Sequence, residues 1–229
     1  MQITYYGHSC FMVTINGTKI LFDPFISPNP LAKDIDIKSI QPNYILISHG
    51  HEDHIADAVA IAKHSGAKVV CAWEIHNWLN KQGVDSTHPM NVGGKWMFEF
   101  GKVKCVSAEH SSSLPDGTYG GTAMGFIIES DKGSFYYSGD TALTYDMKLI
   151  GEFRKLDFAL LPIGDNFTMG VDNAIIASDF IKCNTIIGLH YDTFGYIVID
   201  KKEAIDKFHN SGKKLILMNI GEEIVLKNK

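Results

Sequence analysis

Short runs of β-branched and aromatic residues recur along the chain, and most of them are bounded by Gly, Asn, Asp or Pro. Such runs favour strands over helices. The Asn16-Gly17 pair between two early runs predicts a hairpin, because a type I′ turn needs positive φ at both central residues. The predicted strands are Ile3–Tyr6, Cys10–Ile15, Lys19–Phe22, Tyr44–Ile47, Lys68–Ala72, Val103–Ser107, Ala123–Glu129, Ser134–Tyr137, Phe158–Leu161, Thr185–Leu189 and Lys214–Leu217.

Segments with apolar residues at helical spacing lie between these strands, and Gly follows several of the segments as a stop signal. Hairpins and crossovers mixed in this way predict an α/β fold in which two mixed β-sheets pack together with helices outside. Neither an internal repeat nor a composition break divides the chain, so residues 1–229 are expected to form a single domain. The predicted helices are Ile55–His64, Glu74–Gln82, Tyr145–Lys155, Asp172–Ile181 and Lys202–Asn210.

The composition is that of an ordinary globular protein. With 45% hydrophobic and 21% charged residues, the chain is unlike disordered, collagen-like or coiled-coil proteins. No apolar run approaches the ~20 residues that a membrane span needs, and the start of the chain has no export signal. The four cysteines lie far apart, without the spacing of a zinc or redox motif. These features predict a cytoplasmic protein with buried, free cysteines.

The charge balance bears on the partner. A net charge of −5 gives no electrostatic reason to expect a nucleic acid or an anionic membrane. A small-molecule substrate is therefore the expected partner, with neither nucleic acid nor membrane.

Three histidines and two carboxylates lie within six residues, directly after the apolar run Tyr44–Ile47. Imidazole and carboxylate together are the ligands that zinc, iron and manganese prefer. His49 and His51 point the same way from an extended backbone, whereas Asp53 and His54, at the start of a helix, can face a second ion. The alternative for this segment is a solvated turn with incidental histidines.

Three further potential ligands follow predicted strands in the same way: His110, Asp140 and His190. Taken singly, each histidine could be an ordinary loop residue, and Asp140 could cap a helix. Sites assembled from several strand ends along one sheet edge recur in α/β proteins. Together with the histidine cluster, these residues therefore predict a metal site.

The order His-x-His-x-Asp-His, followed by a distant His, an Asp and a final His, resembles the ligand set of the metallo-β-lactamase superfamily. This resemblance implies a four-layer αββα sandwich with a dinuclear metal centre. In that arrangement metal 1 is held by His49, His51 and His110, metal 2 is held by Asp53, His54 and His190, and Asp140 bridges the two ions.

Other segments are similar to the metal-dependent hydrolases grouped with ascorbate-phosphate lactonase. In that group the motif commonly reads His-Gly-His-Gly-Asp-His, whereas Glu52 occupies the fourth position here. Glu52 is not at a ligand position, so the metal assignment is unaffected. Its charge beside the site disfavours a highly anionic substrate. The similar segments are Gly7-His8-Ser9, Asp23-Pro24-Phe25, Glu109–Ser112, Ser138–Thr141 and Leu161–Asp165.

The resemblance implies a metal-dependent hydrolase in which two divalent ions activate water to cleave a small ester, lactone or phosphodiester. Zinc (Zn2+) is the first expectation, and Mn2+, Fe2+ and Ni2+ are alternatives. Asp53 is the candidate for catalytic proton relay. His8 is a candidate substrate contact, with a plain loop histidine as the alternative. Asp23 is expected to orient a ligand histidine, with a turn residue before Pro24 as the alternative.

Two other functions stay open at this stage. RNA-processing nucleases share these ligands, although the acidic balance and the lack of a Lys/Arg-rich arm count against them. A non-catalytic metal- or metabolite-binding protein is the other alternative. Antibiotic hydrolysis is disfavoured, because the commonest β-lactamases have Cys in place of Asp140 and lack a histidine at the position of His54. Related lactonases form oligomers, which makes a homo-oligomer an open expectation.

The remaining candidates are less specific. The Gly- and Ser-rich segment 111–121 follows a ligand and is either a lid over the site or an ordinary surface loop. Four residues after Phe158–Leu161 could line the pocket: Asp165, Asn166, Thr168 and Met169. Four histidines have no ligand partner nearby in sequence and are expected to be structural or exposed: His64, His76, His88 and His209.

Overall fold

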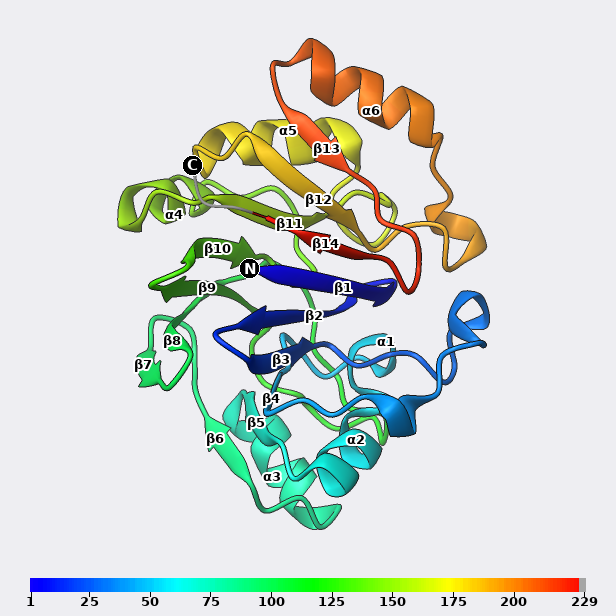
Figure 1. The fold of residues 1–229 in the computed structure, drawn as a ribbon, viewed down its shortest axis with the longest axis vertical. Helices are drawn as coiled ribbons and strands as arrows, with labels where there is room; N and C mark the ends of the chain where they lie inside the picture. Colours follow the sequence, from blue (N-terminus) through cyan, green and yellow to red (C-terminus); the bar gives the residue numbers. More distant parts are fainter. Residues whose placement is uncertain (227–229) are drawn as a thin grey trace.

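Two seven-stranded β-sheets pack face to face in the computed structural model, which describes residues 1–226 (Figure 1). Helices cover the outer face of each sheet, which confirms the predicted αββα sandwich. Side chains from both sheets share one apolar cluster. The single-domain organisation over residues 1–229 stays a prediction, and its last three residues lie outside the described part of the chain.

The first sheet is formed by the N-terminal part of the chain and one C-terminal strand. Its first four strands are antiparallel neighbours, and its last four are parallel. Asn16 and Gly17 have φ values of 51° and 85°, which confirms the predicted hairpin turn. The order across this sheet is β14 (Glu223–Val225), β1 (Gln2–Gly7), β2 (Cys10–Ile15), β3 (Thr18–Phe22), β4 (Tyr44–Leu46), β5 (Lys68–Cys71) and β6 (Thr87–Pro89).

The second sheet repeats this plan, with three antiparallel pairings followed by three parallel ones. Its order is β7 (Lys95–Phe98), β8 (Gly101–Ser107), β9 (Met124–Ser130), β10 (Gly133–Tyr137), β11 (Phe158–Pro162), β12 (Thr185–Leu189) and β13 (Lys214–Ile216). Within each antiparallel half, the second and fourth strands of the sheet order run parallel to the later strands; these are β1 and β3 in the first sheet and β8 and β10 in the second. The C-terminal ends of β1, β3 and β4 therefore share one edge, as do those of β8, β10, β11 and β12.

Six α-helices and three short 3₁₀ helices lie within the described residues. Three α-helices pack on the first sheet: α1 (Glu52–Ile55), α2 (Ala58–Ser65) and α3 (Trp73–Lys81). Three pack on the second: α4 (Met147–Phe153), α5 (Val171–Phe180) and α6 (Lys201–Asn210). The 3₁₀ helices are η1 (Pro30–Ala32), η2 (Ile37–Ser39) and η3 (Gly195–Ile197). Within residues 1–226, no helix is both long and apolar enough to cross a bilayer.

The structure differs most from the predicted helices at Ile55–His64. The chain forms two helices there, α1 and α2, instead of one. Asp57 lies at the break and is buried. Its carboxylate accepts hydrogen bonds from the backbone N–H groups of Ile26 (2.6 Å) and Ser27 (2.8 Å). The break therefore lets one side chain hold the loop after β3 beside the helix that carries the metal motif.

Three strands, β6, β7 and β14, were not predicted from the pattern. Each is three or four residues long and lies at an edge of its sheet, where one side faces solvent and the alternation of polar and apolar residues is weak. Pro89 in β6 is also a strand-breaking signal that only an edge position tolerates.

Aromatic side chains fill the space between the two sheets. Phe11 and Phe22 stack with ring centroids 4.5 Å apart, and Phe22 lies 6.0 Å from Phe135 of the other sheet. Phe135 in turn stacks on Phe158 at 5.0 Å. All four are buried, and offset or edge-on aromatic pairs add to the stability gained from burial. Phe22 thus connects the two sheets directly beneath the end of β3.

Phe22→Ala should lower the free energy of unfolding by about 3–5 kcal/mol, because it leaves a cavity between the sheets. Urea denaturation followed by circular dichroism measures this loss. The matched control is Phe153→Ala at a position 49% exposed on α4, where the cost should be no more than about 1 kcal/mol. Equal losses for the two variants would contradict the assigned role of Phe22.

Candidate metal centre

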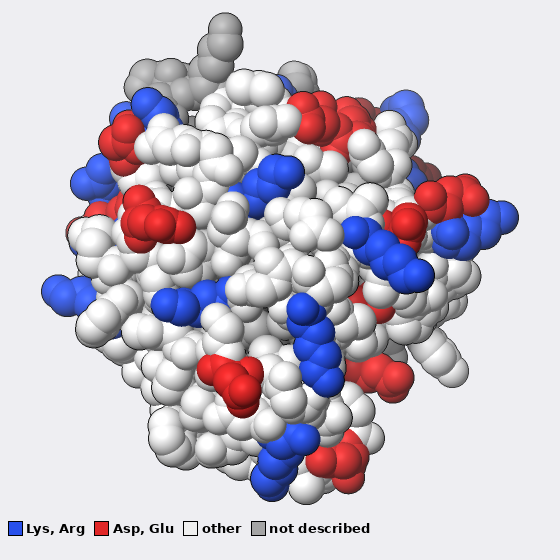
Figure 2. Space-filling model, turned by 60° about the horizontal axis from the view of Figure 1, so that its bottom comes forward, with Lys and Arg blue, Asp and Glu red and all other residues white. Residues whose placement is uncertain are grey.

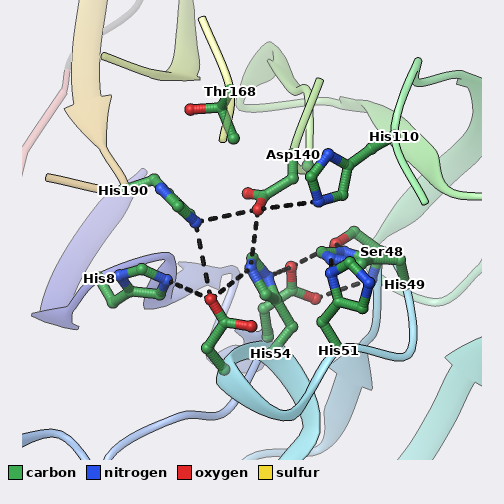
Figure 3. Close-up of polar contacts among 12 residues, drawn as sticks. His8, Ser48, His49, His51, His54, His110, Asp140, Thr168 and His190 are labelled. Carbon is green, nitrogen blue, oxygen red and sulfur yellow. Dashed lines mark hydrogen bonds and ion pairs between the residues drawn. The ribbon is translucent and has the colours of Figure 1, made fainter. Parts of the chain in front are cut away.

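The seven predicted ligands come together where strand ends of the two sheets meet (Figure 3). Some follow β4 directly, others follow β8, β10 and β12, and two belong to the first turn of α1. Within each sheet the parallel direction brings the C-terminal ends to one edge, and the ligands converge where the edges of the two sheets meet. The converging residues are His49, His51, Asp53, His54, His110, Asp140 and His190.

One group consists of His49, His51 and His110. One ring nitrogen from each lies within 4.8 Å of the others. His49 Nε2 is 3.0 Å from His51 Nδ1, and the His110 ring centroid is 5.1 Å from both other rings. Burial lowers the pKa of all three imidazoles, most strongly for His49. The three rings are therefore neutral near pH 7 and present lone pairs that can bind a metal.

A second group lies beside the first and contains carboxylate. Asp53, His54 and His190, together with His8, place one ligand atom each within 4.8 Å of one another. Asp53 Oδ2 is 3.8 Å from His54 Nε2 and 3.7 Å from His190 Nε2. This is a nitrogen and oxygen donor set of the kind that divalent transition metals take.

Asp140 stands between the two groups. Its Oδ2 is 3.0 Å from His190 Nε2 and 3.2 Å from His54 Nε2, and it is 3.6 Å from His110 Nε2. Burial alone would raise the pKa of Asp140, but His190 and His54 outweigh it and lower the pKa well below its ordinary value. An ionised carboxylate in contact with both groups is the geometry that a bridging ligand needs.

The carboxylates change the charge state of the second group. Burial lowers the pKa of His54 and His190, but Asp140 and Asp53 more than compensate. The pKa of His54 is raised well above its ordinary value, and that of His190 is raised to about 9. Without a metal both rings are protonated on both nitrogens, as imidazolium cations, near pH 7. A divalent ion that binds here must displace those protons.

Two buried atoms support a cation at this position. Asp140 Oδ1 has no hydrogen-bond partner within residues 1–226, and His54 Nε2, although 3.2 Å from Asp140 Oδ2, is not in hydrogen-bonding geometry with any atom of those residues. Buried polar atoms are almost always paired, and leaving one unpaired costs about 1–3 kcal/mol. Both atoms belong to the ligand cluster, so a metal ion would satisfy them. The residues present therefore fit a divalent metal.

Asp23, at the end of β3, holds the ligands from behind and is fully buried. Its Oδ2 accepts hydrogen bonds from His54 Nδ1 (2.7 Å), Ser48 Oγ (2.5 Å) and the Tyr137 hydroxyl (2.5 Å). Ser48 Oγ in turn lies 3.0 Å from His49 Nδ1. These bonds put the hydrogens on the Nδ1 atoms, so the Nε2 atom of each ring faces the cluster.

His8, which follows β1, is buried against Asp53. Its Nε2 is 3.0 Å from Asp53 Oδ2, and its Nδ1 is 3.0 Å from the Thr193 hydroxyl. Burial lowers the pKa of His8 to about 4, so the ring is neutral. In this structure His8 positions Asp53, while a direct contact with substrate stays a prediction.

A cavity of about 970 Å³ opens beside the cluster. Five ligands line one part of it: His51, Asp53, His110, Asp140 and His190. Four aromatic residues line another part: Phe25, Phe167, Phe194 and Tyr196. Sequence reasoning did not identify these aromatics as a group, because loops far apart in the chain bring them together. Ser48 and Thr193 were also missed, although both lie close in sequence to a ligand, which is a usable signal.

The less specific candidates from the sequence do not all lie at the cavity beside the cluster. Segment 111–121 is pinned near its start, because the N–H of Gly50 donates to Ser112 Oγ at 3.1 Å, and only Ser111 of this segment lines the cavity. Asp165 and Asn166 line a separate cavity of about 500 Å³. Met169 is buried in the core, and Thr168 is drawn above Asp140 and His190 in the view of Figure 3, with no polar contact to either. The histidines outside the cluster are His64, His76, His88 and His209.

Comparisons with known proteins find relatives over almost the whole chain. Residues 2–190 match the Beta-lactamase superfamily domain. The chain is 56% identical over 227 residues to a UPF0173 metal-dependent hydrolase from Christiangramia forsetii, with 99% of this chain and 100% of that protein covered. It is 43% identical to a UPF0173 metal-dependent hydrolase from Bacillus cereus over 231 residues, with the same coverage. Among solved structures it is similar to Igni18, a metallo hydrolase from Ignicoccus hospitalis, with a TM-score of 0.90, 34% identity, and 100% and 99% of the two chains covered.

Asp140→Ala should lose most of the bound metal, because it removes the carboxylate that touches both ligand groups. Elemental analysis of protein purified without chelators is expected to find about two ions per chain in the unsubstituted protein, the content of a dinuclear site. The control is Asp116→Ala on the exposed turn of segment 111–121, which should keep the full metal content. Retention of metal by the Asp140 variant would rule out its bridging position.

Proposed function

The chain belongs to the β-lactamase superfamily and is a metal-dependent hydrolase, and we propose that it holds two divalent ions and cleaves small carboxylic esters or lactones. The contact of Asp140 with both ligand groups is the observation that carries the dinuclear assignment. When bound, such ions ionise a water molecule near neutral pH and polarise the substrate carbonyl. Zinc is our first assignment, although manganese, iron and nickel accept the same donors.

Three side chains around the reaction centre have distinct parts in this proposal. Asp53 is the ligand carboxylate that is 26% exposed, and it lines the cavity. It takes up a proton from the attacking water and passes it to the leaving alkoxide. His8 holds Asp53 Oδ2 at 3.0 Å in the orientation that this transfer needs, and Thr193 fixes the His8 ring from its other nitrogen.

The cavity favours an ester or lactone over a phosphodiester. Of the residues that line it, none is Lys or Arg. Enzymes that act on phosphate groups usually pair them with cationic side chains. Figure 2 shows Lys and Arg interspersed with Asp and Glu on the face it presents, without a continuous basic patch. Nucleic-acid binding depends on such a patch, so the RNA-processing alternative has less support than a small-molecule substrate.

Metal removal provides the first test. The protein should hydrolyse simple aryl esters or lactones when loaded with zinc or manganese, lose this activity on chelation, and regain it when the metal is restored. Initial rates across a panel of esters, lactones and phosphodiesters measure the effect. Equal rates for the metal-free and metal-loaded protein would contradict the proposal.

His8→Phe tests the positioning of Asp53. The substitution keeps an aromatic ring but removes both hydrogen bonds, and loss of such a supporting partner typically costs about 10–100-fold in metal affinity or activity. Steady-state kinetics together with metal content per chain separates these two effects. His64→Phe is the control, because His64 bonds only to the backbone carbonyl of Ile40, outside the cluster. Unchanged kcat and metal affinity in the His8 variant would remove His8 from the mechanism.

A further inference from the structure

We infer that the cavity selects uncharged esters or lactones that carry an apolar aryl or alkyl group, and that Glu52 disfavours anionic ones. This inference rests on the proposed hydrolase function and specifies its substrate class. Two features of the cavity carry it: an aromatic wall that begins at the metal cluster, and a lining whose charged side chains, apart from histidines, are all acidic.

The aromatic wall starts directly beside the ligands. Phe25 is 4% exposed, and its ring centroid is 6.2 Å from that of Phe194. Both rings also pack against His8, at 5.5 and 5.3 Å, and His8 holds Asp53. A substrate whose carbonyl reaches the cluster would therefore place its neighbouring group against Phe25 and Phe194, which offer apolar contact only.

A second aromatic pair lies farther out. Phe167, in the loop after β11, and Tyr196, in η3, have centroids 6.2 Å apart in an edge-on arrangement. Their residues are 51% and 78% exposed, although both line the cavity. Exposed aromatic surface of this kind is typical of ligand and partner sites. An aryl or alkyl group that extended from the cluster would cover the pair and gain the free energy of apolar burial.

The volume of the cavity agrees with such a group. At about 970 Å³ it lies at the upper end of the ~300–1,000 Å³ that is common for small-molecule sites. A substrate as small as methyl acetate would leave the aromatic residues in contact with water. An aryl or medium-chain group would occupy more of this volume.

The negative charge of the cavity lining is the second feature that selects among substrates. Glu52, the first residue of α1, is exposed and lines the cavity, and the lining contains neither Lys nor Arg. An anionic group on the distal part of a substrate would meet the Glu52 carboxylate with no compensating cation from the protein. Coulomb repulsion across several ångströms of partly solvated space corresponds to about a three- to tenfold change in affinity.

Matched substrates test the role of Glu52. The pair is phenyl acetate and 4-carboxyphenyl acetate, which differ by a carboxylate placed away from the reacting carbonyl. The metal-loaded protein should prefer the neutral ester in kcat/KM. In Glu52→Gln this preference should shrink about three- to tenfold, mainly through a lower KM for the anionic ester. Glu109→Gln is the control, because Glu109 is exposed but does not line the cavity, and it should keep the original preference.

The aromatic pair is tested by size rather than charge. The preference for phenyl acetate over methyl acetate should fall about tenfold or more in the double variant Phe167→Ala/Tyr196→Ala, as expected for loss of an apolar subsite. A readout that does not depend on turnover is calorimetric binding of acetanilide, the amide analogue of phenyl acetate, to the metal-loaded protein. Acetanilide should bind the unsubstituted protein and bind the double variant more weakly.

The outcomes distinguish failure of the proposed hydrolase function from failure of the inferred substrate selectivity. A metal-loaded protein that hydrolyses no ester or lactone would overturn the proposed function and this inference with it. A protein that hydrolyses phenyl acetate but treats its 4-carboxy derivative equally, or whose preference is unchanged in Glu52→Gln, overturns the inference and leaves the hydrolase function standing. Equal binding of acetanilide to the double variant overturns the role of the aromatic pair.

Discussion

The candidate site depends most on the hydrogen bonds that the buried carboxylate of Asp23 accepts. It follows β3 of the first sheet, yet it accepts a hydrogen bond from Tyr137 of the second sheet and others from Ser48 and His54. A buried carboxylate is tolerated only when several donors satisfy it. Burial, then Asp23 and Asp140, raise the pKa of Tyr137 well above its ordinary value, so the phenol stays a donor. One side chain thus joins the two sheets and orients the candidate ligand histidines.

The common plan of the two sheets explains where the functional residues come from. Each sheet has three antiparallel pairings followed by three parallel ones, and two pairs of equivalent strands are followed by the same residue type. His8 follows β1 as His110 follows β8, and Asp23 follows β3 as Asp140 follows β10. In the second sheet both residues belong to the candidate ligand cluster, whereas in the first sheet they hydrogen-bond to its members Asp53 and His54. The site is therefore asymmetric although the framework that carries it is similar on both sides.

Much of this arrangement could be predicted from the sequence, because it depends on local patterns. Apolar strands with a ligand at the C-terminal end predict a shared sheet edge, and the spacing of His49 and His51 predicts a common direction. The aromatic wall could not be predicted, since Phe25, Phe167 and Tyr196 lie on loops whose course depends on tertiary packing. The break at Asp57 was missed for the same reason: its hydrogen-bond partners lie about thirty residues earlier in the chain.

The central claim is that two ions share Asp140, and anomalous diffraction from crystals of the zinc-loaded protein tests it most directly. The account predicts two peaks at the zinc edge, one among His49, His51 and His110 and the other among Asp53, His54 and His190, with the Asp140 carboxylate between them. A single peak, or peaks away from these side chains, would contradict the account.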